Sequence, residues 1–169
     1  MKKLVIAFVA SALLAVPALA ADKIAVVNTA AAIFSSNAAK AKAEAAQKSA
    51  DYIALKAKLD SATADLQALA KEWEAKSVTW SAEQKAEHQK KMEYVQADRE
   101  LAGRKIQAEN KALEQEIVTE LRPIAQKALQ EIVDKESITL LLPAEAVVWA
   151  KPELDITGKL ADAINKTAK

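Results

Sequence analysis

Apolar residues recur at alternating intervals of four and three in the middle of the chain, and this spacing constrains the fold more than any other feature. The series is Leu55, Leu59, Ala62, Leu66, Leu69 and Trp73, with Lys, Asp, Glu and Gln at most positions between them. Such a heptad pattern is typical of a helix that packs along a partner helix. The chain has 169 residues and only two glycines, a composition that favours long helices over a thick globular core.

The helical pattern lapses at residues 77–80 and then resumes. Ser81 is followed three residues later by Gln84, which is the spacing of a capping box at the start of a helix. We therefore predict a long antiparallel helical hairpin with its tip near residues 77–80. One continuous helix is the alternative, because no proline interrupts this region. The predicted arm seam comprises Leu55, Leu59, Leu66, Leu69, Trp73, Ile106, Leu113 and Ile117.

Three aromatic or imidazole side chains flank the predicted tip. Trp73 falls on the seam, so we expect it to pack within the hairpin. Trp80 directly precedes the cap and is expected either to pack at the tip or to contact a client or a membrane interface. His88 is the only histidine and lies among charged residues. We expect it to be a solvated surface residue, because no metal-ligating partner stands at a suitable spacing.

The ends of the chain have a different sequence pattern from the middle. Pro123 is expected either to bend the return helix or to begin a new one. Short β-branched runs predict strands at residues 23–28, 137–142 and 146–150, with a turn at residues 143–146 and a last helix from about residue 157 to 166. Three short strands that are apolar on both faces cannot bury those faces within a single chain. We therefore predict an α+β, mostly helical fold, whose small β body pools strands from several chains.

Residues 1–20 have the three parts of a secretory signal peptide. Lys2 and Lys3 precede an apolar run, and a small-x-small cleavage site ends at Ala20. An uncleaved membrane anchor is the alternative, but the apolar run is short for a membrane span. Removing the two lysines lowers the net charge of the chain from +1 to about −1. We therefore expect an exported protein without a strongly basic surface for nucleic acid.

The chain lacks the residue patterns of common enzymes. It has no cysteine, no glycine-rich loop and no recognisable nucleophile motif. We accordingly expect no enzymatic activity, no cofactor and no metal. Structural stability must come from packing or assembly, because an exported chain without cysteine has no disulfides.

Several segments together resemble the Skp (OmpH) family of periplasmic chaperones. They are the signal peptide, "KIAVVN" leading into a helix, the charged hairpin, and "PELDIT" with the helix that follows it. The resemblance implies a homotrimer, with residues 21–34 and 123–169 as the oligomerisation body and residues 35–122 as the arm. It implies a barrel core formed by Ile24, Val26, Ile138, Leu140, Leu142 and Val148.

The function implied by this resemblance is that of a holdase. Such a protein would bind unfolded outer-membrane proteins between its arms, without ATP, in the periplasm of a Gram-negative bacterium. Its partners would be these clients and its own copies, with no nucleic acid and no stable membrane insertion after signal cleavage. A structural or adaptor coiled-coil protein of the bacterial envelope is the alternative function.

Two features depart from the family pattern. Residues 40–122 carry fifteen basic and fifteen acidic side chains, whereas some members are strongly basic, so a lipopolysaccharide site is not carried over. Pro143 stands where an aspartate is expected after the strand. The neutral arm also disfavours a histone-like role in binding DNA.

Overall fold

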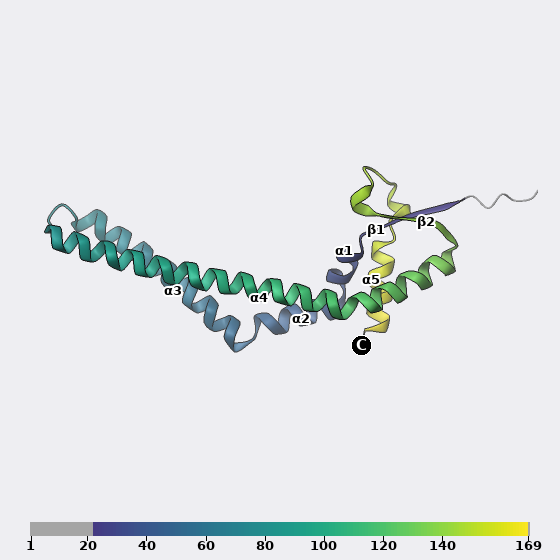
Figure 1. Cartoon of the computed structure of the whole chain (residues 1–169), viewed down its shortest axis with the longest axis horizontal. Helices are drawn as coiled ribbons and strands as arrows, with labels where there is room; N and C mark the ends of the chain where they lie inside the picture. Colours follow the sequence, from purple (N-terminus) through teal and green to yellow (C-terminus); the bar gives the residue numbers. More distant parts are fainter. Residues whose placement is uncertain (1–21, 169) are drawn as a thin grey trace, which may run out of the picture.

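The computed structural model describes residues 22–168, so the predicted signal peptide lies outside the described residues. The fold has a long arm and a small body that lies at one end of it (Figure 1). The elements in chain order are β1 (Lys23–Val27), α1 (Thr29–Ser35), α2 (Asn37–Gln47), α3 (Ala50–Lys76), α4 (Ala82–Glu136), β2 (Ile138–Pro143), two 3-10 turns (Ala144–Ala146 and Pro152–Leu154) and α5 (Thr157–Thr167). The prediction of a mostly helical α+β fold is confirmed.

The arm is the antiparallel pair of α3 and α4, and residues 77–81 form the connection at its far end (Figure 1). The capping box expected from Ser81 and Gln84 is present. The Ser81 backbone N–H donates to Gln84 Oε1 at 2.9 Å, and the Gln84 N–H donates to Ser81 Oγ at 3.2 Å. These reciprocal bonds satisfy amide donors that the first turn of α4 would otherwise leave free.

The chain that ascends from the body is broken into three helices, which the sequence pattern did not predict. Asn28, Ser36 and Ser49 cap α1, α2 and α3, and each side chain accepts a hydrogen bond from the backbone N–H three residues further on. Figure 1 shows this limb bending away from α4 near the junction of α2 and α3. Lys42 ties α2 back to α4, because its Nζ lies 2.8 Å from Glu116 Oε1 and also pairs with Glu120.

The return helix α4 continues through Pro123 to Glu136, so the alternative of a helix that ends and restarts at the proline is wrong. Pro123 is exposed, which allows water to solvate the carbonyl group that loses its helical partner. Figure 1 shows that the C-terminal part of α4 runs in a different direction from the arm. The last turns of α4 therefore belong to the body.

The sheet described in residues 22–168 has two parallel strands, β1 and β2, rather than three. The strand predicted at residues 146–150 is wrong, since a 3-10 turn and an irregular segment occupy that region. The second neighbour of β1 is instead the chain around Asp155, and the Ile156 N–H donates to Val26 O at 2.9 Å. Pro143 ends β2 because it has no N–H with which to extend the strand pairing.

The body core lies between the sheet, α1, α5 and the C-terminal part of α4. Its buried members come from every one of these elements and include Ala25, Val27, Ile33, Leu121, Ala125, Ile138, Ile156, Leu160 and Ile164. The last helix predicted from about residue 157 to 166 is α5, and its Leu160, Ala161 and Ile164 are buried. Among residues 22–168, no helix is both long enough and apolar enough to cross a membrane.

We expect Ser137→Gly to stabilise the body. Ser137 caps the C-terminus of α4 with φ 52° and ψ 46°, a left-handed conformation in which a Cβ is unfavourable and glycine is preferred. The free energy of unfolding should rise by about 0.5–1 kcal/mol, measured by urea denaturation. Ser77→Gly is the matched control, because Ser77 caps α3 with φ −60° and should gain nothing. Equal effects of the two changes would contradict this explanation.

The Glu136 carboxylate should make stability depend on pH. Hydrogen bonds from Lys159 and Lys23 lower the pKa of Glu136 from 4.5 to about 2. Because the folded-state pKa lies below the unfolded value, this contribution is present above about pH 5 and is lost as the pH falls toward 2. Glu136→Gln should therefore reduce the loss of stability between pH 5.5 and pH 3, measured from urea midpoints. Glu131→Gln, on an exposed part of the same helix, should keep the wild-type dependence.

Candidate functional site

One face of the sheet is apolar and remains open to solvent in the single chain. Ile24 pairs with Leu140 across the two strands, and their side chains are 41% and 47% exposed. Val148 and Trp149, in the segment after β2, are also highly exposed. Exposed apolar side chains that gather at a sheet mark a surface suited to association with another chain.

The other predicted body residues are more enclosed. Val26 is buried and borders a hollow formed with Ala144, residues 147–152 and Asp155. Leu142 is half-buried. Ile138 lies in the body core, away from the exposed Leu140, because a register shift between Lys23 and Ile24 interrupts the expected alternation along β2.

The predicted seam residues lie along the arm and differ in burial. Leu69 and Ile117 are buried, whereas Leu55, Leu59, Leu66, Ile106 and Leu113 are half-buried and Trp73 is exposed. Ile117 and Leu113 belong to the body end, where they contribute to or pack against the core. In the middle of the arm, Ala62 and Ala102 are the small residues that become buried. Two helices enclose few of the larger side chains, Leu69 being one of them, so much of the arm's apolar surface remains accessible.

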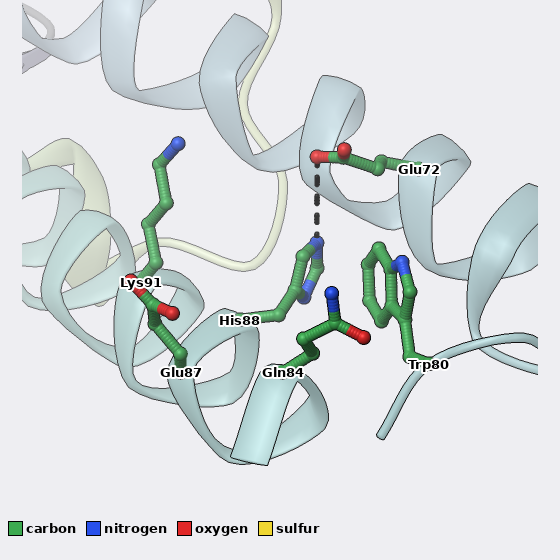
Figure 2. A pocket seen from close by; sticks show the side chains of 6 residues that line it. All are labelled: Glu72, Trp80, Gln84, Glu87, His88 and Lys91. Atoms are coloured by element: carbon green, nitrogen blue, oxygen red, sulfur yellow. Dashed lines mark ion pairs between the residues drawn. The ribbon is translucent and has the colours of Figure 1, made fainter. Parts of the chain in front are cut away.

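The arm tip contains a cluster of two tryptophans and the histidine, which we name the tip cluster: Trp73, Trp80 and His88. The ring centroids of Trp73 and Trp80 lie 5.8 Å apart in an edge-to-face arrangement, and the His88 ring lies 5.6 Å from Trp73 and 4.8 Å from Trp80. Figure 2 shows Trp80 alongside the imidazole of His88. Trp80, whose contact with clients stays a prediction, is therefore also a packing residue of the tip.

The expectation that His88 is a solvated surface residue is wrong, since it is only 8% exposed. The sequence contained a signal for this placement. Met92 and Val95 lie on the return-helix seam, and a step of four residues back from Met92 reaches His88. The charged residues around His88 in the sequence obscured its position on the helix seam, where the two tryptophans cover it.

Two hollows accompany the tip cluster. One has a volume of about 250 Å³ and is lined by Glu72, Trp80, Gln84, Glu87, His88 and Lys91 (Figure 2). The other has a volume of about 420 Å³ and is lined by Ala70, Trp73, Glu74, Gln89 and Met92. The second hollow combines an indole with a flexible thioether, a pairing that adapts to differently shaped apolar groups.

The electrostatics of the tip are set by paired charges. Lys76 donates to Glu72 Oε1 at 3.0 Å, and this hydrogen bond is the main cause of a lowered pKa for Glu72. Within residues 22–168, no three His, Cys, Asp or Glu side chains gather as a possible metal site. Along the arm, the described surface consists of shallow apolar areas and of charged side chains that form ion pairs.

The chain is similar to a protein family and to a solved structure. A family model described as outer membrane protein (OmpH-like) matches residues 23–164. The crystal structure of a candidate outer membrane chaperone (OmpH-like) from Caulobacter crescentus CB15 has 22% sequence identity and a TM-score of 0.49, covering 86% of this chain and 85% of that chain. No curated protein matches the chain. Because the family model spans nearly all of the described residues, this protein belongs to the OmpH-like outer membrane protein family.

Proposed function

We propose that this protein is an ATP-independent holdase chaperone of the periplasm, which binds unfolded outer-membrane proteins between its arms and prevents their aggregation. The observation that carries the proposal is the arm itself. The α3–α4 hairpin projects from the body (Figure 1) and leaves most of its apolar seam only half-buried. A structure of this kind provides a large contact surface rather than one deep pocket.

The body supports the proposal by an apolar face that a single chain leaves open. Ile24 and Leu140 are side by side and nearly half exposed in the single chain, and the sheet has only two strands within the described residues. Pooling this face among copies would bury it and satisfy the open strand edge. We propose a homotrimer, the assembly that the family resemblance implies, with the arms extending from a shared body.

The proposed mode of binding relies on many weak contacts. Exposed apolar side chains occur along the whole arm, including Ile53, Val78, Tyr94 and Leu101. Each contact contributes little, but together they cover client segments that would otherwise associate with one another. Adaptable surfaces of this kind accept clients of different sequence. Release would follow from the client's own folding or transfer, without nucleotide.

The test is an aggregation assay with an unfolded outer-membrane barrel protein that is diluted from denaturant. The purified protein should suppress light scattering in the absence of ATP. Unchanged scattering would contradict the proposal. Stoichiometric binding of one folded envelope protein, without effect on aggregation, would instead support the adaptor function.

A narrower prediction concerns Trp80. Trp80→Ala should weaken client binding by roughly 3- to 10-fold, because an aromatic contact typically contributes about 1 kcal/mol. Client affinity would be measured by fluorescence anisotropy, with circular dichroism to verify that the arm stays helical. Tyr94→Ala is the control for loss of an exposed aromatic elsewhere on the arm. If Trp80→Ala leaves client affinity unchanged while Tyr94→Ala lowers it, the role of Trp80 is packing alone.

A further inference from the structure

Beyond the proposed function, we infer that protonation of His88 changes the contacts that hold α3 against α4 at the arm tip. Its charge state decides whether aromatic packing alone joins α3 to α4 at the tip, or whether an ion pair between the helices is added. The inference rests on the surroundings of the His88 ring and holds whichever client the arm binds.

The first observation is that the imidazole is enclosed without hydrogen bonds. Within the described residues, neither Nδ1 nor Nε2 has a hydrogen-bond partner, and both atoms are shielded from solvent. A neutral imidazole carries one N–H donor and one acceptor, so both go unused in this arrangement. Buried polar groups of this kind are uncommon in folded proteins and call for a physical explanation.

The second observation is a carboxylate just beyond hydrogen-bonding distance. Glu72 Oε2 on α3 lies 3.8 Å from His88 Nε2 on α4, as the dashed line in Figure 2 marks. Glu72 is held from its other side by Lys76, one turn along α3. Glu87 and Lys91 on α4 line the same hollow. The charged groups around the ring are therefore two carboxylates and two ammonium groups. Protonation of the imidazole would change the net charge of this set.

Protonation of His88 would alter both sets of contacts. The added proton places an N–H donor on the nitrogen that was an acceptor, and the nearest carboxylate is that of Glu72. A movement of about 1 Å would bring the two atoms to the usual distance of a charge-assisted hydrogen bond. The same positive charge would lie within about 6 Å of both indole rings, a range in which cations are attracted to aromatic faces.

The rearrangement has a consequence for the hollow that contains Trp80. Drawing Glu72 toward His88 sets the imidazolium in competition with Lys76 for one carboxylate. It also changes the net charge of the side chains that line the hollow, because His88 is one of them. Histidine is the side chain that most readily changes its charge near neutral pH, so the shape and charge of the tip would respond to protonation of the ring.

The test uses tryptophan emission, because two of the three tryptophans belong to the tip cluster. In a Trp149→Phe background, emission should follow one sigmoidal transition as the pH is lowered. His88→Phe, which keeps a packed ring, should abolish this transition. Glu72→Gln should shift its midpoint to lower pH, whereas Glu74→Gln, which borders the other hollow, should leave the midpoint unchanged.

A second measurement does not depend on the folding of any variant. His88 is the only histidine in the sequence, so ring NMR signals of the wild-type chain, purified without a histidine tag, report on it alone. Its titration should coincide with the emission transition. The inference is overturned if the emission transition persists in His88→Phe, if the ring signals do not titrate together with the emission, or if Glu74→Gln shifts the midpoint as much as Glu72→Gln.

Discussion

Leu140→Lys is expected to dissociate the proposed trimer into folded single chains. Leu140 is 47% exposed in the single chain, so a lysine there can reach water and should leave the protomer intact. In a body that pools its strands, the same ammonium group would be buried without a partner, which costs several kcal/mol. A penalty of about 3 kcal/mol per interface weakens association roughly 100-fold.

The oligomeric state would be measured by light scattering coupled to gel filtration over a range of concentrations. Leu101→Lys is the matched control, because Leu101 is 41% exposed and lies on the arm rather than the body. The control should remain trimeric. A wild-type protein that is monomeric at all concentrations would refute the pooled body, and a trimeric Leu140→Lys would place the interface on another face.

Leu121→Ala is expected to produce the largest loss of stability within the protomer. Leu121 is 1% exposed and belongs to the body core, where α4 meets α1 and α5. Truncating a fully buried leucine removes its favourable burial and leaves a cavity, at a cost of about 2–5 kcal/mol. The free energy of unfolding would be measured by urea denaturation at a fixed protomer concentration, since association also contributes to apparent stability.

Leu101→Ala provides the comparison on the same helix. Its side chain is partly exposed, so its truncation should cost less than about 1 kcal/mol, as is usual for surface substitutions. Similar losses from the two substitutions would show that the α4 body segment is not the main source of protomer stability. A loss from Leu121→Ala below about 1 kcal/mol would show that the core can close around the missing side chain.

Local signals predicted the helical elements well. The Ser81–Gln84 capping box acts between residues three positions apart, and both it and the last helix predicted from about residue 157 to 166 are present in the structure. The breaks at Ser36 and Ser49 were not predicted, although both serines cap helices. Serine is common in helices and loops alike, so its identity does not reveal which role it has.

The strand predictions show where local patterns are insufficient. Residues 138–142 and 146–150 have similar apolar composition, yet only the former pairs with β1. A strand requires a neighbouring backbone, and the neighbour on the other side of β1 is the chain around Asp155. Pairing between residues more than a hundred positions apart depends on the complete fold and leaves no short-range signal.

The sequence by itself determined the helical arm, its turn and the apolar character of the strands, because caps and heptad spacing act between neighbours along the chain. Only the tertiary structure decided that His88 is enclosed by two tryptophans, and that Ile138 faces the core while Leu140 remains exposed. Those outcomes depend on which surfaces meet after the arm folds back and the two ends of the chain come together. Burial is a property of the assembled neighbours, and the same side chain can be covered or open according to what packs against it.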